Sequence, residues 1–374
     1  MKPTALHQLV AGFAAGDAIS HEALALRAIC REAGLASEIY APANRIAADA
    51  TESCRPLEAF HPGPDDTVLF HYSITSPATA AFLAPHITDH SPNVGGALRR
   101  GDSSLARKIV IYHNITPPEF FAPFDATVAR HLTEARQELK AILGQADAIW
   151  ADSAYNAAEL TALGFAQAKV FPLLFRPDEP ALPPDPSVLA KFAVPMKNIL
   201  FVGRIAPNKC IEELITAFAW FHKNIETQSR LLIVGSDRSA PTYYAMLKMY
   251  AAELGLDTVF FERFASPAGL NAYYQVADLF VTTSRHEGYC LPLLEAMDKG
   301  VPVLARHTGG TPEAMGDAGV LFDDLRTEEL AELFGMACFD ASFRQTILES
   351  QKRRMETLRA RPVKEEFLAL LGRG

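Results

Sequence analysis

The sequence contains few cysteines, and no two of them stand at the spacing of a metal-binding pair. There are five, and none belongs to a CxxC motif: Cys30, Cys54, Cys210, Cys290 and Cys338. An odd number of scattered cysteines argues against a disulfide framework and against a zinc site. It favours a reducing, cytoplasmic compartment.

Basic residues and long apolar runs are also scarce. Lys and Arg total 35 against 44 Asp and Glu, which gives a net charge of −9. This balance argues against a nucleic-acid partner, which would need a basic surface. The N-terminal stretch lacks a signal-peptide pattern, and no uncharged apolar run reaches the roughly 18 residues of a membrane span. We therefore expect a cytoplasmic protein that at most contacts the inner face of the membrane peripherally.

The sequence does contain many short apolar runs separated by amphipathic stretches. Five such runs precede residue 175 and five follow it, among them DTVLFHY at 66–72 and NILFVG at 198–203. Helices are expected between them at 18–33, 124–143, 211–224 and 241–254. Continuous apolar strands that alternate with helices are typical of parallel sheets covered on both faces. The expected fold class is α/β, with two Rossmann-like, doubly wound domains facing a cleft.

Proline marks the boundary between the two expected domains. Six prolines fall within 175–195, which disfavours a helix or a central strand there. We expect an N-terminal domain at 1–175, a linker at 176–196, a second domain at 197–358 and a C-terminal helix at 359–374 that returns to the first domain. The unpatterned stretch 86–108 is expected to be a mobile loop.

Two strand-to-helix loops gather the residues that suggest chemistry. In FVGRIAPNK, 201–209, a strand is followed by Gly203, Arg204 and Lys209 before a helix. Backbone N–H groups and two cations at a helix N-terminus suit a diphosphate. The alternative is an ordinary turn with two solvated basic side chains.

The second loop, SRHEGYCLPLLEAM at 284–297, carries two glutamates eight positions apart. Pro292 is expected to open the helix, because proline is best tolerated at the first helical position. Glu287 then belongs to the loop before Gly288, and Glu295 to the first turns of the helix. The alternative is that Glu295 only stabilises the helix N-terminus and that Glu287 is a surface acid.

Three stretches together resemble the C-terminal domain of the retaining GT-B glycosyltransferases of family 4. They are GRIAPNKCIEELITAF, VTTSRHEGYCLPLLEAMDKGVPVLAR and GGTPEAMGDAGVLF, within a likeness that runs over 199–322. The family's hallmark is Glu, seven residues, Glu. GFAAGDAISHEALAL, YHNITPPEFF and ADSAYNAAEL extend a weaker likeness into the N-terminal half. The resemblance implies a GT-B fold whose N-terminal domain binds the acceptor and whose C-terminal domain binds a nucleotide-sugar donor.

The resemblance also implies a role for individual residues. Arg204 and Lys209 would neutralise the donor diphosphate. Glu295 would bind the nucleotide ribose, and Glu287 would lie beside the transferred sugar. His113 would contact the hydroxymethyl side of that sugar, although a histidine after an apolar strand is by itself more often a packed core residue.

Further positions are implied by the same likeness. Donor-binding positions are Gly203, Gly288, Tyr289, Cys290 and Leu291. Gly12, Gly16 and Asp17 would form a loop that approaches the acceptor or the phosphates. The sequence departs from the family pattern at Cys210, at Tyr289-Cys290 and at Asp298-Lys299, so the donor's identity cannot be deduced from these positions.

The implied activity is a retaining hexosyl transfer, of mannose or glucose type, from a donor such as GDP-mannose or UDP-glucose. The expected acceptor is a glycan in bacterial surface polysaccharide biosynthesis. Seven Lys or Arg against three Glu in 351–374 suggest that this acceptor sits on a lipid carrier. No DxD-like acidic pair is placed to hold a metal, so we expect neither a metal nor another cofactor.

Three alternatives stay open at this stage. A GT-B enzyme could glycosylate a small soluble metabolite or a sugar phosphate. The chain could instead be a catalytically silent GT-B binding subunit, which the presence of the expected site residues disfavours. A nicotinamide dehydrogenase ranks low, because the first strand is followed by GFAAGD rather than GxGxxG.

Overall fold

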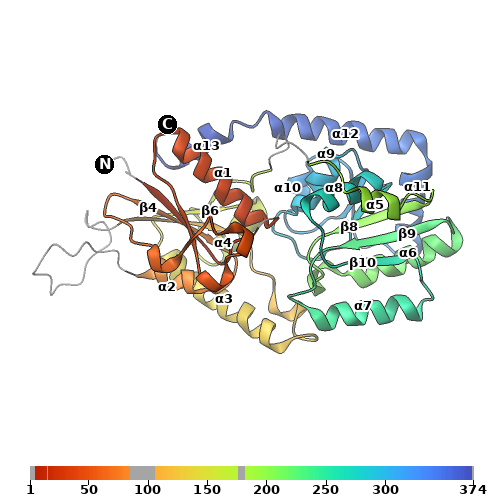
Figure 1. The fold of residues 1–374 in the computed structure, drawn as a ribbon, viewed down its shortest axis with the longest axis horizontal. Helices are drawn as coiled ribbons and strands as arrows, with labels where there is room; N and C mark the ends of the chain where they lie inside the picture. Colours follow the sequence, from red (N-terminus) through yellow and green to blue (C-terminus); the bar gives the residue numbers. More distant parts are fainter. Residues whose placement is uncertain (1–4, 15, 85–105, 176–181, 373–374) are drawn as a thin grey trace, which may run out of the picture. The chain divides into compact units, whose positions relative to one another are not determined.

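The computed structural model describes residues 5–14, 16–84, 106–175 and 182–372. The chain forms two compact units (Figure 1). Unit 1 comprises Met1–Ile115, Arg130–Leu174 and Pro362–Gly374, and unit 2 comprises Thr116–Ala129 and Phe175–Arg361. Each unit contains one parallel sheet with helices packed on it, which is the α/β, two-domain architecture expected from the sequence.

The sheet of unit 1 has seven strands in the order β3-β2-β1-β4-β5-β6-β7. The strands are β1 Leu6–Val10, β2 Ile39–Ala41, β3 Arg55–Pro56, β4 Thr67–Tyr72, β5 Arg107–Tyr112, β6 Ala148–Ala151 and β7 Lys169–Val170. The helices are α1 Ala18–Glu32, α2 Pro77–Leu83, α3 Ala126–Gly144, α4 Ala154–Ala162 and α13 Val363–Leu370, and the 3-10 turns are η1 Ala43–Arg45, η2 Ala48–Ala50, η3 Leu57–Ala59 and η4 Pro118–Phe120. Every residue of β4 is buried, because helices cover both faces of this sheet.

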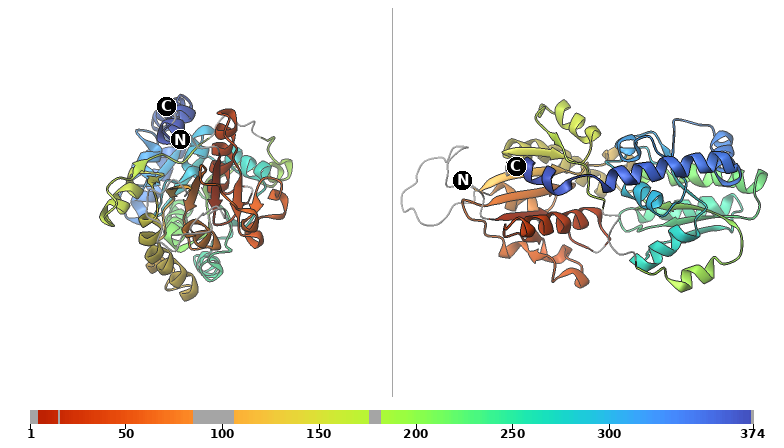
Figure 2. Two further views of the ribbon diagram at one scale, coloured as in Figure 1. Left: turned by 90° about the vertical axis from the view of Figure 1, so that its left-hand side faces the viewer. Right: turned by 90° about the horizontal axis from the view of Figure 1, so that it is seen from above.

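The sheet of unit 2 has six strands in the order β10-β9-β8-β11-β12-β13. They are β8 Lys197–Val202, β9 Ser229–Val234, β10 Val259–Glu262, β11 Leu279–Thr282, β12 Val303–Arg306 and β13 Val320–Phe322. The helical elements are α5 Pro186–Lys191, η5 Pro207–Lys209, α6 Ile211–Asn224, α7 Pro241–Glu253, α8 Pro267–Val276, α9 Leu291–Asp298, α10 Thr311–Met315, α11 Thr327–Phe339 and α12 Ala341–Arg359. Two further views of the layers are given in Figure 2.

All ten expected apolar runs contain a strand, and the four expected helices match α1, α3, α6 and α7 within two residues. Three strands were not expected. They are β2, β3 and β13, which have three, two and three residues. Runs this short show no periodicity of their own, and their place is set by pairing with a neighbouring strand.

The expected linker at 176–196 is partly wrong, because residues 186–191 form helix α5. Pro186 occupies the first helical turn, where its missing N–H is not needed, and Asp185 caps the helix by accepting a hydrogen bond from the N–H of Ser187 (2.8 Å). The amide of Asn271 on α8 donates to Leu182 O at 2.6 Å. This part of the stretch therefore belongs to the folded body of unit 2.

Two other expectations concern segments near the ends of the units. Of the expected loop at 86–108, residues up to 105 lie outside the described part of the chain, and β5 begins at Arg107. At the C-terminus, α13 groups with unit 1, where Phe367 and Leu371 are buried in a core cluster with Trp150 and Phe171. Of the helices in the described ranges, none has both the length and the apolar character needed to cross a membrane.

Candidate functional site

The first candidate site lies in unit 2, at the carboxyl ends of β8 and β11. The backbone passes so close here that glycine is required. A Cβ on Gly235 would lie 1.9 Å from the carbonyl oxygen of Gly203. The loop then runs past the exposed Arg204 to Lys209 and to Cys210, which adopts a left-handed conformation with φ 47° at the N-cap of α6. The lysine is thereby fixed next to a helix N-terminus.

Lys209 and Glu287 form the central ion pair of this site. Their Nζ and Oε1 atoms are 2.6 Å apart, and their side chains are 13% and 7% exposed. Burial alone would raise the pKa of Glu287, but the neighbouring ammonium outweighs it and holds that pKa below its ordinary value. The structure thus brings together two of the residues expected to act on the donor.

Close backbone packing holds the Glu287 loop in place. Gly310 N–H donates to the carbonyl oxygen of Glu287 at 3.0 Å. A Cβ on Gly309 would lie 2.1 Å from the same oxygen, and one on Gly310 would lie 2.0 Å from Gly288 O. This glycine pair belongs to one of the stretches that carry the family resemblance, but it is not among the predicted site residues. The signal in the sequence is a Gly-Gly step that begins three residues after the end of an apolar strand.

The second glutamate is held by a tyrosine. Glu295 lies on α9, which begins at Leu291 rather than at the expected Pro292, because proline is also tolerated at the second helical position. The hydroxyl of Tyr274 donates to Glu295 Oε2 at 2.7 Å. Glu295 is half-buried, while Glu287 is buried. The two carboxylates therefore have different partners and different environments, and their expected roles stay predictions.

Residues 289 and 290 complete the turn into α9. Tyr289 is buried, and Cys290 adopts a left-handed conformation with φ 72° at the N-cap. Burial raises the pKa of the Cys290 thiol well above its ordinary value, so this side chain stays neutral. Both positions turn the backbone and carry no charge.

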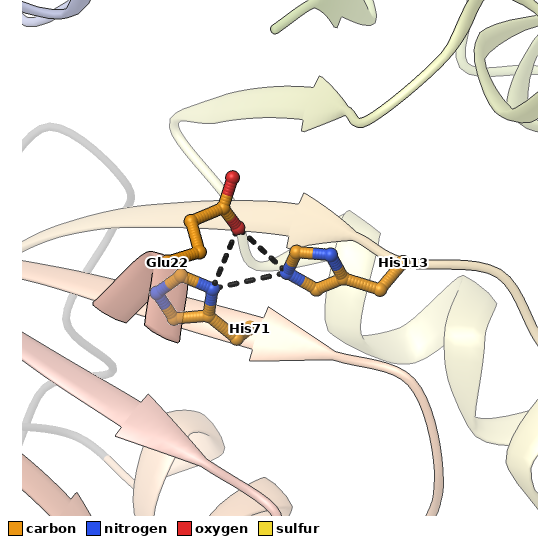
Figure 3. Close-up of side chains that lie close together, drawn as sticks. All are labelled: Glu22, His71 and His113. Carbon is orange, nitrogen blue, oxygen red and sulfur yellow. Dashed lines mark hydrogen bonds and ion pairs between the residues drawn. The ribbon is translucent and has the colours of Figure 1, made fainter. Parts of the chain in front are cut away.

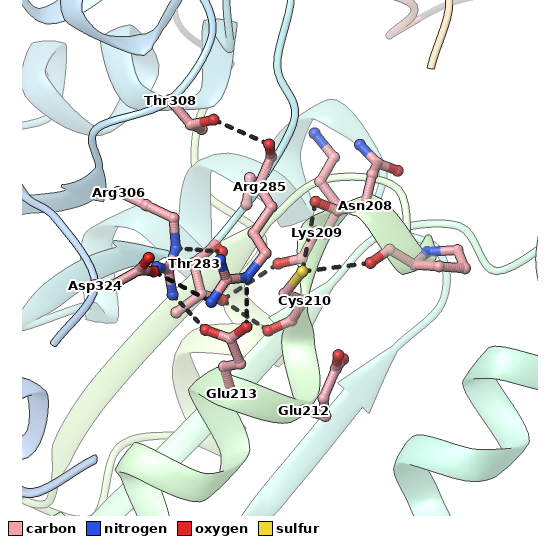
Figure 4. Close-up of polar contacts among 12 residues, drawn as sticks. Asn208, Lys209, Cys210, Glu212, Glu213, Thr283, Arg285, Arg306, Thr308 and Asp324 are labelled. Carbon is pink, nitrogen blue, oxygen red and sulfur yellow. Dashed lines mark hydrogen bonds and ion pairs between the residues drawn. The ribbon is translucent and has the colours of Figure 1, made fainter. Parts of the chain in front are cut away.

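A network of ion pairs fixes the base of the Lys209 loop (Figure 4). The buried Arg306 donates to Thr283 O at 3.1 Å and also pairs with Glu213 and Asp324. Arg285 Nε lies 2.8 Å from Glu213 Oε1. A polar hollow of about 180 Å³ beside this network is lined by Arg285, Arg306, His307, Thr308, Asp323 and Asp324. Carboxylates pair with both of its arginines, so this hollow offers no unpaired cation to an anionic ligand.

The second candidate site lies in unit 1, at the carboxyl ends of its strands. Asp17 caps helix α1, and its Oδ2 accepts hydrogen bonds from Ser20 N at 2.9 Å and from Ser20 Oγ at 2.8 Å. Gly16 has φ 81°, a conformation that favours glycine. A Cβ on Gly12 would lie 3.4 Å from Arg45 O. All three residues therefore contribute to the structure of the turn into α1. Their expected contact with substrate stays a prediction.

His113 belongs to a buried cluster in unit 1 (Figure 3). Its Nε2 lies 3.0 Å from His71 Nδ1 and 3.5 Å from Glu22 Oε2. Its Nδ1 lies 3.4 Å from Asp152 Oδ2. Burial works to lower the pKa of His113, but the Asp152 and Glu22 carboxylates outweigh it, and the result is a pKa above the ordinary value. Burial lowers the pKa of His71.

Glu22, His71 and Asp152 are not among the site residues predicted from the sequence. A signal existed for two of them. Glu22 stands three residues after Ile19 and four before Leu26, on the apolar stripe of helix α1, and His71 interrupts a fully apolar strand. A charged residue that faces a core needs a partner. Asp152 carried no such signal, because it follows its strand.

The expected site residues fall into two groups, each within its own unit. Unit 2 holds Gly203, Arg204, Lys209, Glu287, Gly288, Tyr289, Cys290, Leu291 and Glu295, and unit 1 holds Gly12, Gly16, Asp17 and His113. Both groups lie at the carboxyl ends of parallel strands, which is where open α/β sheets bind ligands.

Comparison with known proteins supports this picture. Residues 191–352 match the family described as glycosyl transferases group 1. The serotype-specific mannosyltransferase WbdA of Escherichia coli is 30% identical over 42% of this chain but over only 19% of its own length. The mannosylfructose-phosphate synthase of Agrobacterium fabrum is 33% identical over 37% of this chain and 32% of its own. The chain thus matches a third or less of the length of these curated relatives.

Solved structures match over nearly the whole chain. The sucrose-phosphate synthase of Thermosynechococcus elongatus has a TM-score of 0.69 at 20% identity and covers 98% of both chains. Anabaena HepE, solved in complex with UDP and glucose, has a TM-score of 0.71 at 17% identity, over 98% of this chain and 99% of its own. The fold is thus of the GT-B type, with two Rossmann-like domains.

Proposed function

We propose that the protein is a retaining glycosyltransferase that moves a hexose of mannose or glucose type from a nucleotide-diphosphate sugar to a glycan acceptor. The Lys209–Glu287 pair carries this proposal. It joins a cation at a helix N-terminus to a buried carboxylate, inside the segment that matches the glycosyl transferases group 1 family. That combination suits a substrate with an anionic leaving group and a ring that becomes positive.

Each charged group has a distinct task in the proposed reaction. The Lys209 ammonium has three N–H donors, one of which is directed at Glu287, so others can serve diphosphate oxygens. The exposed Arg204 adds a second cation. Glu295, held by Tyr274, accepts hydrogen bonds from the ribose hydroxyls. Glu287 stabilises the sugar ring as its positive charge grows.

The bond changes balance without a metal or another cofactor. The bond between the anomeric carbon and the diphosphate oxygen breaks, and the diphosphate leaves with the electron pair. The acceptor oxygen bonds to the anomeric carbon on the same face, and its proton passes to the departing phosphate. Lys209 and Arg204 provide the positive charge that a divalent metal would otherwise supply.

Two acceptor classes follow from the relatives. A mannosyltransferase among them favours a glycan acceptor of surface polysaccharide assembly, which we propose to be carried on a lipid. The mannosylfructose-phosphate synthase and the D-inositol 3-phosphate glycosyltransferase of Acidothermus cellulolyticus favour the second candidate, a small sugar or inositol phosphate. Several cations of the basic C-terminal segment are already used within the fold. Arg359 pairs with Asp298, and Arg354 donates to Ala314 O. This weakens the case for membrane contact.

Calorimetry with GDP-mannose and UDP-glucose, followed by transfer assays on both acceptor classes, tests the proposal. Lys209→Met should abolish donor binding, whereas Lys223→Met, which removes an exposed lysine from helix α6, should leave it unchanged. The anomeric configuration of the product, observed by NMR, tests retention, and turnover should persist in EDTA. Failure of both nucleotides and their hexose analogues to bind would overturn the proposal.

A further inference from the structure

The hydrogen bonds around the unit 1 cluster fix where its protons lie. Gln8 Nε2 donates to Ala23 O at 2.9 Å, so Gln8 Oε1 is the atom that faces His71 Nε2, also at 2.9 Å. An amide oxygen can only accept, and therefore His71 Nε2 carries a proton. In neutral His71 the other nitrogen, Nδ1, then has a free electron pair.

This electron pair faces His113. His71 Nδ1 and His113 Nε2 are 3.0 Å apart, and the two rings are within 10° of parallel. Two electron pairs at this distance would repel each other, so either a proton or a metal ion must lie between the nitrogens. A proton on His113 Nε2, donated to His71 Nδ1, meets this requirement.

Two carboxylates favour a second proton on the same ring. His113 Nδ1 lies 3.4 Å from Asp152 Oδ2, and Glu22 Oε2 lies 3.5 Å from both facing imidazole nitrogens. Glu22 is fully buried, and its Oε2 reaches the two facing imidazole nitrogens only at 3.5 Å. A buried carboxylate without a compensating charge is costly. Protonation of His113 on both nitrogens provides that charge.

We propose that Glu22 and His71 are positioning residues that hold His113 as an imidazolium in one fixed orientation. A role of this residue in transfer rests on the glycosyl transfer proposed above. Both nitrogens of His113 face protein groups, so neither is placed to donate a proton to a substrate.

A metal ion is the competing occupant, because one Glu and two His are common zinc ligands. The ring geometry favours the proton. The ring centroids are 5.2 Å apart and the facing nitrogens 3.0 Å. The centroid separation exceeds the nitrogen separation by about two ring radii, so each nitrogen points almost straight at the other (Figure 3). Two ligands of one ion would instead both tilt toward a third point.

The first experiment determines the protons directly. Nitrogen NMR of the protein labelled with ¹⁵N-histidine at pH 7 should show His113 protonated on both nitrogens and His71 on Nε2 alone. The charged groups that face His113 are Glu22 and Asp17 from helix α1, His71 from β4 and Asp152 after β6. Glu22→Gln removes one of these charges and should lower the pH at which His113 titrates by about one unit or more. Glu32→Gln, on the exposed side of the same helix, is the matched control.

The second experiment measures turnover against pH. Glu22→Gln should move the alkaline loss of activity to lower pH by the shift seen by NMR. Glu22→Asp should restore part of the charge and therefore part of that shift. Circular dichroism shows whether each variant folds.

The outcomes separate the two proposals. A stoichiometric transition metal in the purified protein, or a neutral His113 at pH 7, overturns the imidazolium. An imidazolium in a protein without any transferase activity overturns the proposed function alone. An active Glu22→Gln variant with an unchanged pH profile shows that the cluster has only a structural role.

Discussion

The two candidate sites neutralise buried charge in different ways. In unit 2, one lysine meets one glutamate at 2.6 Å, and each group keeps some exposure. In unit 1, the imidazoles of His71 and His113 lie next to the carboxylates of Glu22 and Asp152. Each of these four side chains is at most 4% exposed. In a pair of fixed charges, each group can exchange its partner for a charged group of a ligand that binds. A cluster balanced by a proton keeps its charge constant only within a range of pH.

The comparison also shows why one site is easier to recognise than the other. The residues of unit 2 lie in two short motifs, each a loop between a strand and a helix. Those of unit 1 come from α1, β4 and the residues after β5 and β6, so sequence separations of 42 to 63 residues divide the hydrogen-bonded partners His71, His113 and Gln8. Only the fold brings them together.

The largest expected effect follows from breaking the unit 2 pair. Lys209→Met leaves the buried carboxylate of Glu287 without its paired cation and should cost about 3–5 kcal/mol of unfolding free energy. The double variant Lys209→Met/Glu287→Gln removes both charges and should regain most of that loss. Urea denaturation of the two variants measures it. Equal losses in both would mean that the ion pair is not what the lysine contributes.

The two glutamates of unit 2 should differ in kinetics. Glu287→Gln should lower kcat by a factor on the order of 10² to 10³, because its charge acts on the ring as positive charge develops. Glu295→Gln should mainly raise the donor KM, because its contact is the same in ground and transition states. Steady-state kinetics with calorimetry of donor binding distinguishes them. Intact turnover with lost donor binding in Glu287→Gln would make the pair a binding clamp only.

The two sites should also respond to pH in opposite directions. The pKa of Glu287 is lowered from about 4.5, so its contribution to stability is present above that pH and is lost as the pH falls through the folded value. The pKa of His113 is raised from about 6.5, so its contribution is present below that pH and is lost as the pH rises through the folded value. Unfolding free energies from pH 3 to 9, for wild type, Glu287→Gln and His113→Gln, test this. Glu287→Gln should reduce the pH dependence of the unfolding free energy only at acidic pH. His113→Gln should reduce it only at alkaline pH.

The smallest effect concerns the turn into α9. Cys290 adopts φ 72° at a position where the left-handed conformation costs a residue with a Cβ about 1–2 kcal/mol. Cys290→Gly should therefore raise the unfolding free energy by about 1 kcal/mol after the loss of the half-buried side chain is counted. Thermal unfolding measures the change. Cys338→Ala, in helix α11, is a control without backbone strain.

Much of the fold could be predicted because most of its strands are continuous apolar runs. β4 and β9 are buried at every position, and such runs stand out in sequence. β3 has only two residues, both exposed, and its position depends on pairing with β2. α5 is not predicted by the six prolines of its stretch, which disfavour a helix, but Pro186 fits the first helical turn.

The same reasoning applies to the candidate sites. Lys209 and Glu287 could be proposed from their motifs, and the structure places them in contact. Their distance could not be predicted, because it depends on the close approach of Gly309 and Gly310 to the Glu287 loop. In unit 1, Glu22 and His71 are polar residues within apolar sequence patterns. Only the fold shows that both lie next to His113.

Helix α13 belongs to unit 1 although it follows unit 2 in the sequence, and this affects how unit 1 folds during synthesis. Phe367 is buried against Trp150 at a ring distance of 5.9 Å, and Arg107 donates to Leu371 O at 2.9 Å. These contacts close the core of the unit whose first strand is β1. On the ribosome, that unit starts first and is completed last, because its core lacks Phe367 until all of unit 2 has been translated. An N-terminal fragment that ends before residue 362 would leave this apolar surface open to chaperones.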